Sequence, residues 1–262
     1  ADELGKIMQA KPPTSFRETI SLLGTALELR HAKPKKVKNG PCKEIIIKGA
    51  DLKRTGAALP TLLNLPIQQC WPQDAGRFIT LPCVVTQDPD SKDRNLGMYR
   101  MQVFDQRTTA LHWQLQKVAA RHGRRYFEEG RRMPVSVFLG GDPAYAFCAS
   151  APLPDGLDEL LLAGWLRQKS VPLIKCETND LEVPADADIV LEGYVDPTEP
   201  LRDEGPFGDH TGYYSQDGDY PVFNITAITH RKKPIYLTTI VGKPPQEDFY
   251  LGKATERIFL PL

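Results

Sequence analysis

The chain has 262 residues, enough for one large domain with a substantial buried core or for two small ones. Its 33 Lys and Arg residues balance 33 Asp and Glu residues, so no overall field attracts nucleic acid or an anionic membrane. The five cysteines lack any CxxC spacing, which argues against a zinc site or a disulfide framework and favours a cytoplasmic location. No apolar run is long enough for a membrane span.

The chain opens with a helical pattern and then changes to strand patterns. Residues 1–40 place Phe16, Ile20, Leu23 and Leu27 on one helical face, and we expect a helical lead-in segment there. Short apolar runs separated by Gly, Pro, Asn and Asp follow, and they predict strands. The expected strands are 44–48, 81–86, 97–104, 135–139, 173–177, 188–195, 220–230 and 235–241. Arg231–Pro234 is expected to form a hairpin turn between the last two.

Two helical patterns interrupt the expected strands, at 115–129 and at 157–166, the second with Asp155 and Gly156 as its cap region. The chain shows no regular βαβ alternation and no glycine fingerprint of a dinucleotide-binding fold. Many short strands with a few inserted helices predict an α+β fold, mainly antiparallel and barrel-like.

The segment Glu204–Tyr214 carries two carboxylates, those of Glu204 and Asp209, five residues apart. Pro206 and three glycines keep this segment out of any helix or central strand, so a loop can point both acids into one pocket. Paired carboxylates repel each other as anions, so the pKa of one tends to rise and that residue can act as a general acid. The alternative is an acidic turn at the surface.

The segment Asn95–Arg100 follows a polar loop and opens an expected strand. Asn95 offers a neutral carbonyl oxygen, and Arg100 offers a guanidinium suited to a carboxylate or a phosphate. Residues five apart in a strand face opposite sides, so Asn95 must lie in the loop if both side chains address one site. The alternative is a loop Asn beside a strand Arg that pairs with a surface acid.

Glu159 lies in the first turn of the expected helix 157–166. A glutamate there usually complements the helix dipole, but its carboxylate can equally bind a hard cation. Oxygen donors such as Asn95 and Glu159 favour magnesium or manganese over zinc. His112 precedes Trp113 and is expected in a strand, and His122 is expected at the surface or in a capping position.

Together these segments resemble the UbiD family of reversible decarboxylases, named for 3-polyprenyl-4-hydroxybenzoate decarboxylase. The similar stretches cover most of residues 40–262 and are Cys70–Pro72, Asn95–Arg100, Pro134–Val137, Gly141–Ala144, Asn179–Pro184, Ile189–Gly193, Glu204–Tyr214 and Gly242–Pro245.

The resemblance implies a cofactor, prenylated FMN, bound with a divalent metal that is manganese or magnesium and often with a potassium ion. It also implies that Arg100, Glu204 and Asp209 occupy the family's Glu-Arg-Glu catalytic network. Asp209 follows the polyprenyl-hydroxybenzoate branch, whereas the ferulic-acid branch has Glu there.

The resemblance assigns Asn95 and Glu159 to two metal-ligand positions. The family's third metal ligand is a His, and this chain has Gln116 there. A Gln oxygen is also a hard donor, but it is neutral and does not replace an imidazole. His112, four positions earlier, is a poor substitute for that His. The resemblance also implies that Asn95, Arg100, Gln114 and Gln116 contact the cofactor.

The family's architecture implies a split β-barrel cofactor domain, related to that of flavin reductases, over 41–245. Residues 246–262 would begin a helix leading to a C-terminal α/β domain that mediates homo-oligomer assembly. Because the chain begins without Met and ends in the apolar run 258–262, we expect a fragment that lacks this domain.

The resemblance implies decarboxylation, or the reverse carboxylation, of an aromatic or α,β-unsaturated acid, with a flavin prenyltransferase supplying the cofactor. Two other functions stay open. Gln116 and the missing domains are compatible with a non-catalytic or partner-dependent cofactor-binding subunit. An ordinary FMN-binding barrel of the flavin-reductase type would instead oxidise NAD(P)H, although nothing in the chain indicates a nicotinamide site.

Overall fold

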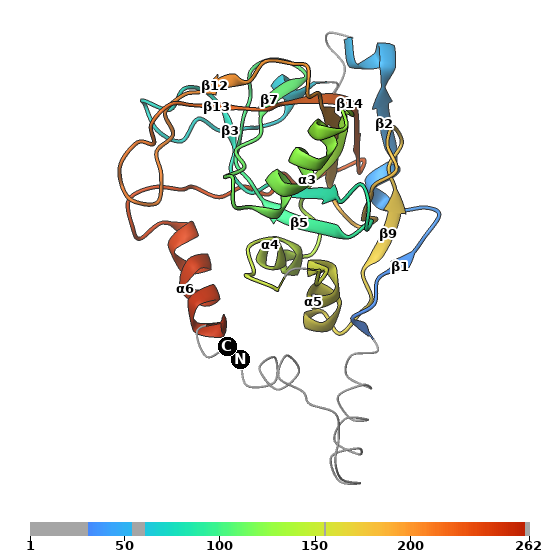
Figure 1. Ribbon diagram of the computed structural model, residues 1–262. Helices are drawn as coiled ribbons and strands as arrows, with labels where there is room; N and C mark the ends of the chain where they lie inside the picture. Colours follow the sequence, from blue (N-terminus) through green and yellow to red (C-terminus); the bar gives the residue numbers. More distant parts are fainter. Residues whose placement is uncertain (1–30, 54–60, 155, 260–262) are drawn as a thin grey trace.

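A computed structural model describes residues 31–53, 61–154 and 156–259 of the chain (Figure 1). The expected helix over 1–40 lies outside the described residues up to residue 30; over 31–40 the expectation is wrong, because this part contains strand β1 and no α-helix. The elements are β1 (Lys35–Lys36), η2 (Pro41–Lys43), β2 (Ile45–Lys48), η3 (Gly49–Lys53), η4 (Leu62–Asn64), β3 (Phe78–Ile79), β4 (Cys83–Gln87), β5 (Arg94–Met98), β6 (Met101–Gln102), β7 (Thr108–Ala110), α3 (Val118–Glu128), β8 (Met133–Leu139), α4 (Pro143–Ala149), α5 (Glu159–Leu166), β9 (Pro172–Lys175), β10 (Glu182–Pro184), β11 (Ile189–Val195), β12 (Arg202–Glu204), β13 (Gly218–Tyr220), β14 (Val222–His230) and α6 (Glu247–Phe259).

One sheet organises the molecule, with the strand order β2-β14-β11-β8-β4-β5 and with β7 also paired to β14. Every pairing in this sheet is antiparallel. Smaller groups, β1-β9-β10, β3-β6 and β12-β13, surround it, and only the β1-β9 pair among the described strands is parallel. The expected α+β class with mainly antiparallel strands is confirmed. The described strands pair in an open order, so the split barrel stays a prediction.

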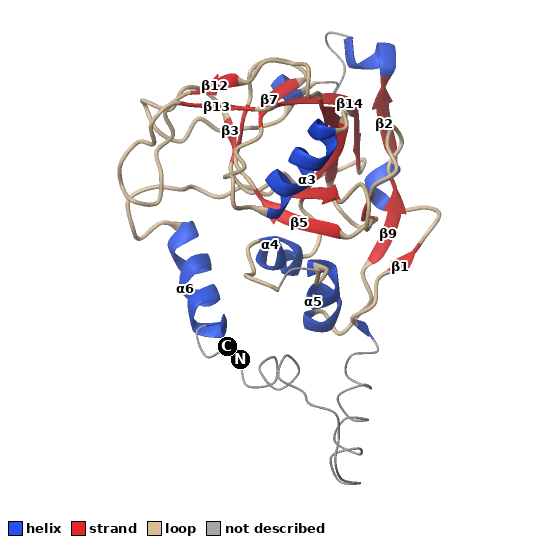
Figure 2. Ribbon diagram, in the orientation of Figure 1, coloured by secondary structure: helices blue, strands red, loops and turns tan. Residues whose placement is uncertain are grey.

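Both faces of the central sheet are covered by apolar side chains. Along β4, Val84 belongs to one buried cluster while Cys83 and Val85 belong to the other. The same alternation places Leu191 and Val190 of β11 on opposite faces, as the two-residue period of a strand requires. Helix α3 packs on the first face, and α4 and α5 pack on the second (Figure 2). The sheet is thus a rigid centre from which the connecting loops project.

Helix positions differ from the expectations at several ends. Helix α3 begins at Val118 rather than at 115, and α5 begins at Glu159 after the N-cap Asp158, whose side chain accepts a hydrogen bond from the Leu160 amide. The expected cap region at 155–156 is therefore wrong. Helix α4 was not expected, because its seven residues are too short to show a helical period. No helix in the described ranges is long and apolar enough to cross a membrane.

The expected strand at 235–241 and the hairpin at Arg231–Pro234 are wrong. This segment forms no strand, although its apolar pattern resembles one. Side chains satisfy part of its backbone instead of a neighbouring strand: the Thr80 hydroxyl accepts from the Thr239 amide at 3.2 Å, and the Trp71 indole donates to the Val241 carbonyl at 2.7 Å. The segment is thereby fixed beside the turn that contains Trp71.

Candidate active site

Arg100 lies in a break between two strands. The expected strand 97–104 is interrupted, since β5 ends at Met98 and β6 begins at Met101. The guanidinium donates to Glu204 Oε2 from Nη2 at 2.8 Å and from Nε at 3.1 Å, and to Asp209 Oδ2 from Nη1 at 3.2 Å. Its centre lies 4.7 Å from the centroid of the Phe207 ring. One arginine thus joins both acids of the 204–214 segment.

Glu204 is the last residue of β12, and its two neighbours on that strand are exposed while it is 1% exposed. Gln102 holds the following residue in place, since its Oε1 accepts a hydrogen bond from the Gly205 amide at 3.0 Å. Glu204 Oε2 receives the bonds from Arg100, whereas the buried Oε1 has no hydrogen-bond partner among the described residues. A buried oxygen without a partner is costly, which is typical of a functional site.

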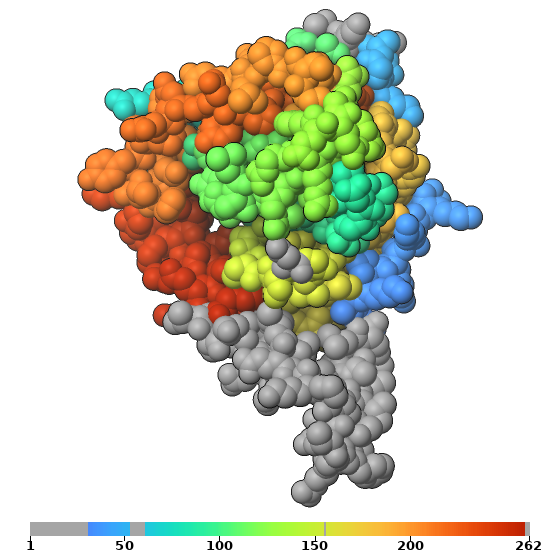
Figure 3. Space-filling model, in the orientation of Figure 1, coloured from blue at the N-terminus to red at the C-terminus, as the bar shows by residue number. Residues whose placement is uncertain are grey.

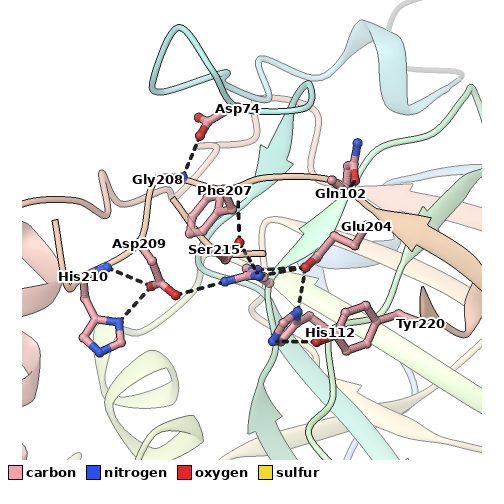
Figure 4. Close-up of polar contacts among 12 residues, drawn as sticks. Asp74, Gln102, His112, Glu204, Phe207, Gly208, Asp209, His210, Ser215 and Tyr220 are labelled. Carbon is pink, nitrogen blue, oxygen red and sulfur yellow. Dashed lines mark hydrogen bonds and ion pairs between the residues drawn. The ribbon is translucent and has the colours of Figure 1, made fainter. Parts of the chain in front are cut away.

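Close packing against Trp71 shapes the turn after Glu204. A Cβ on Gly208 would lie 2.3 Å from an indole carbon of Trp71, so the backbone approaches the ring as only glycine permits. Asp74 accepts a hydrogen bond from the Gly208 amide at 2.8 Å (Figure 4). Phe207 is buried. This part of the 204–214 segment is a buried, anchored turn, and the alternative of an acidic surface turn does not describe it.

Asp209 lies on the side of the arginine opposite Glu204 (Figure 4). Its side chain is 26% exposed. Burial raises the pKa of Asp209, but hydrogen bonds from the amide and ring of His210 and the charge of Arg100 outweigh burial, and the net effect lowers the pKa. Asp209 therefore stays ionised at neutral pH and holds one end of the guanidinium.

His112 is part of this network, which the sequence did not indicate. It lies in the loop after β7, not in a strand, and its Nδ1 is 2.6 Å from Glu204 Oε2. Its ring packs against Tyr220 at a centroid distance of 4.2 Å (Figure 4). Ser215 was also missed; its hydroxyl accepts from Arg100 at 3.2 Å and from the Phe207 amide at 3.1 Å. No local pattern marks these residues, because only the folded chain brings them to Arg100.

Asn95 and Glu159 meet at a second place, a cavity of about 310 Å³ whose lining includes neither Arg100 nor the two acids that it joins. Asn95 belongs to β5 and not to the preceding loop, and its side chain faces Tyr99 at 3.4 Å. Glu159 Oε2 accepts a hydrogen bond from the Leu96 amide at 2.8 Å. Burial raises the pKa of Glu159 to about 7, although the bonds from the Leu96 and Glu159 amides oppose it. Both predicted oxygen ligands therefore line one cavity.

His122 lines the same cavity, and the expectation of a surface or capping position for it is wrong. It is 5% exposed, and its Nδ1 is 3.0 Å from the Thr86 hydroxyl. Arg94 and Arg125 add positive charge to the walls, and Asp88 adds negative charge. Within the described residues, no group of three or more His, Cys, Asp or Glu side chains could hold a metal ion.

Gln114 and Gln116 lie apart from both places. Both are exposed, and the Gln116 amide donates to Gln114 Oε1 at 2.8 Å instead of lining the cavity of Asn95 and Glu159. The segment 95–100 connects the cavity to the arginine network, since it carries Asn95 at one end and Arg100 at the other. In the space-filling view, α3, in green, and the orange part of the chain that includes the 204–214 segment are both exposed on the same face (Figure 3).

The model of the UbiD family, described as the 3-octaprenyl-4-hydroxybenzoate carboxy-lyase Rift-related domain, matches residues 34–244. A protein of Archaeoglobus fulgidus is 50% identical over 95% of this chain and 50% of its own length. One of Aquifex aeolicus is 50% identical over 99% of this chain and 52% of its own. The chain thus spans about half the length of the curated relatives it matches.

Two solved structures are also similar. Vanillic acid decarboxylase of Sedimentibacter hydroxybenzoicus, in closed form, has a TM-score of 0.78 and 30% identity, over 91% of this chain and 50% of that one. An evolved dimeric form of the UbiD-class enzyme HmfF from Pelotomaculum thermopropionicum, in complex with prFMN, has a TM-score of 0.78 and 32% identity, over 89% of this chain and 53% of that one. By its match over residues 34–244, the chain belongs to the UbiD family.

Proposed function

We propose that the chain is the cofactor-binding part of a prenylated-FMN-dependent, reversible decarboxylase of an aromatic or α,β-unsaturated carboxylic acid. The observation that carries the proposal is the network in which Arg100 joins Glu204 to Asp209. The prFMN complex of the related HmfF enzyme and the vanillic acid decarboxylase with the same fold support it. We further propose that residues 41–245 form the split-barrel cofactor domain and that α6 begins the connection to a C-terminal domain.

Most of the predicted residues lie where they could contact such a cofactor or its metal ion, and Gln116 does not. Glu204 Oε1 is buried without a partner in the described structure and is free to face a reactant. Asn95 and Glu159 would hold a divalent manganese or magnesium ion in their cavity, with Arg94 and Arg125 as counter-charges for a phosphate. Gln116 does not fit, because it lies exposed on Gln114. When bound, the prenylated flavin supplies the electron sink that decarboxylation needs and no side chain can provide.

The chain's own residues would orient the acid and supply the proton. The Arg100 guanidinium binds the substrate carboxylate, and Asp209 holds that guanidinium from the far side. Glu204 donates the proton that replaces carbon dioxide on the substrate carbon. Because Glu204 is 1% exposed, bulk water is kept from its carboxyl group during this transfer.

The substitution Glu204→Gln tests the proposal. The amide keeps the shape of the side chain but cannot donate an acidic proton, so we expect turnover to fall by about 10³-fold while the flavin stays bound. Asp203→Asn, one position earlier on β12 and exposed, is the matched control and should leave turnover unchanged. Protein made together with a flavin prenyltransferase is assayed by carbon dioxide release, and the bound flavin is measured by its absorbance. Undiminished single-turnover decarboxylation by Glu204→Gln would remove Glu204 as the acid.

The exposed position of Gln116 favours a second candidate, a cofactor-binding subunit that works only with a partner chain. Colourless protein that assembles with a partner and releases no carbon dioxide would support this second function. NAD(P)H oxidation with unmodified FMN would instead support a flavin-reductase-type barrel. We propose a cytoplasmic location, which the five unpaired cysteines support, and a homo-oligomer formed through regions outside this sequence.

A further inference from the structure

The cavity that holds the two predicted oxygen ligands, Asn95 and Glu159, also contains a buried imidazole, that of His122. The family resemblance implies a histidine at position 116 as the third ligand. Gln116 is exposed instead and does not line this cavity. A nitrogen donor for this site must therefore come from another part of the chain.

We propose that His122 is the third ligand of the divalent metal ion, together with Asn95 and Glu159. The proposal rests on the proposed function and deepens it, because it assigns a ligand at a different position from the histidine that the resemblance implies. It also chooses between the two candidate ions. Magnesium favours oxygen ligands, and an imidazole shifts the preference of a site toward manganese and the other divalent transition metals.

Helix α3 turns His122 toward the central sheet. Buried residues of α3 recur at the three- and four-residue spacing of one helix face, and they include Ala119, His122, Gly123 and Tyr126. This face packs against β4 and β5. The His122 ring meets Thr86 of β4, whose hydroxyl is 3.0 Å from Nδ1. Thr86 lies directly opposite Asn95 in the β4-β5 pair, so the side chains of both project from the same face of the sheet, beside the imidazole.

Glu159 reaches Asn95 from the other face of the sheet. Strand β5 is last in the sheet order, so its outer backbone edge has no neighbour among the described strands. At this edge the Leu96 amide, directly after Asn95, donates to Glu159 Oε2 at 2.8 Å. Helices α3 and α5 lie on opposite sides of β5 (Figure 2). The two helices thus bring His122 and Glu159 to Asn95 from opposite faces.

The existing hydrogen bonds leave a lone pair for coordination on both Asn95 and His122. The Asn95 amide nitrogen donates to the Tyr99 hydroxyl at 3.4 Å, which leaves Oδ1 as the coordinating atom. When His122 Nδ1 donates its proton to the Thr86 hydroxyl, Nε2 carries the lone pair of the ring. Histidines that bind metal ions commonly have this arrangement, in which one ring nitrogen donates a hydrogen bond and the other binds the ion.

The two aspartates of the cavity are less suitable ligands. Asp88 Oδ1 accepts hydrogen bonds from two backbone amides, and its Oδ2 pairs with Arg125. Asp93 is exposed and accepts from the Ser91 hydroxyl at 2.8 Å. Among the described residues that line the cavity, His122 is the only histidine. Its imidazole is therefore the nitrogen donor that this cavity offers to a metal ion.

Pulsed electron paramagnetic resonance of bound manganese tests the ligand directly. Protein made together with a flavin prenyltransferase is freed of metal by a chelator and is then loaded with manganese. We expect the wild-type spectrum to show nitrogen modulation from a coordinated imidazole, and we expect His122→Gln to lose it. His210→Gln changes an exposed histidine outside the cavity, and as the matched control it should keep the modulation.

Isothermal titration calorimetry measures the same contact as an affinity. Loss of a group that only orients a ligand costs about 10–100-fold in metal affinity, so loss of the ligand itself in His122→Gln should weaken manganese binding by about 100-fold or more. Magnesium binding should change much less. Because His122 is buried, thermal unfolding checks that the variant is folded. Thr86→Val keeps His122 but removes the hydroxyl that holds Nδ1, and it should weaken manganese binding about tenfold with the nitrogen modulation retained.

Manganese bound to wild-type protein without nitrogen modulation would exclude His122 as a ligand, and this result needs no variant. A folded His122→Gln that keeps both the modulation and the affinity would show that the ring only packs α3 against the sheet. Absence of manganese binding would equally refute the assignment. Failure of the proposed function is distinguishable, because it would appear as an absence of carbon dioxide release by flavin-loaded wild-type protein, whatever its manganese spectrum.

Discussion

Two places in the molecule hold carboxylates in opposite environments. At the arginine network, Glu204 and Asp209 are paired with a cation that the chain supplies, and their bonds to Arg100 are 2.8–3.2 Å long. At the cavity of Asn95 and Glu159, arginines line the walls, but the burial of the half-buried Glu159 outweighs the charge of Arg94 and raises the pKa of Glu159 to about 7.

The difference separates carboxylates that are paired with an arginine from a carboxylate whose environment favours the protonated form. A buried acid whose charge is not compensated takes up a proton instead of remaining ionised. A divalent cation would reverse that preference, because it stabilises the carboxylate form. The arginine network thus already contains its own cation, while the cavity would change its charge state if the proposed divalent ion bound there. Four predictions test this contrast, ordered by the size of their expected effects.

Substitution of Arg100, which joins Glu204 to Asp209, should have the largest effect. Arg100→Ala leaves the buried Glu204 and the partly buried Asp209 without their shared partner, so we expect turnover to fall about 10³-fold and stability to fall by roughly 3 kcal/mol. Arg100→Lys keeps the charge but cannot contact both acids, and it should recover less than a tenth of the activity. Turnover assays and urea unfolding measure the two effects. Near wild-type activity in Arg100→Lys would show that hydrogen bonds from one guanidinium to both acids are not required.

Glu159 should give the cavity a distinct pH dependence. The pKa of Glu159 is about 7 in the folded protein and 4.5 in the unfolded chain. When a chelator keeps metal ions away, the stabilisation of the folded protein by the protonated carboxyl group is therefore complete below pH 4.5 and is lost as the pH rises to 7. Glu159→Gln should therefore be more stable than wild type at pH 8 by up to about 3 kcal/mol, with little difference at pH 4. Manganese should stabilise wild type only. Glu256→Gln, on the exposed side of α6, is the control, and urea unfolding at both pH values is the measurement.

A methyl group added at Gly208, in the turn between Glu204 and Asp209, should disturb the arginine network although Gly208 makes no contact with Arg100. Gly208→Ala would place Cβ 2.3 Å from the Trp71 ring, so we expect a loss of about 1–3 kcal/mol together with weaker activity. Gly252→Ala is the matched control, because its Cβ meets nothing within 4 Å and α6 should gain about 0.5–1 kcal/mol. Thermal unfolding compares them. Equal changes in the free energy of unfolding of the two variants would show that the Trp71 ring moves aside at little cost.

The smallest expected effect concerns residue 116. Gln116→His restores the imidazole that the family has at this position, and we expect manganese affinity to rise about tenfold, or about 1.4 kcal/mol. Gln114→His is the control, and isothermal titration calorimetry gives both affinities. An unchanged affinity would show that residue 116 stays outside the cavity in the bound state, as it does in the structure.

Much of the fold could be predicted from local pattern. The runs at 135–139 and 188–195 are long and apolar, and they became β8 and β11 of the central sheet. The run at 235–241 was equally apolar but formed no strand, since strand formation requires a neighbouring backbone and this one contacts Thr80 and Trp71 side chains instead. The apolar pattern of a segment shows that it is suited to a strand, whereas hydrogen bonds to a neighbouring strand decide whether it forms one.

The two acids and the arginine could be identified from local sequence, because two segments contain closely spaced groups of matching chemistry, Asn95–Arg100 and Glu204–Asp209. The meeting of these segments, the contact of His112 with Glu204 and the position of Gln116 away from the cavity follow from how the chain folds. The two kinds of information differ in the sequence distance over which they act. Backbone preference acts over a few neighbouring residues, while the contacts of Glu204 join positions about a hundred residues apart, and those depend on how the sheet and its loops pack.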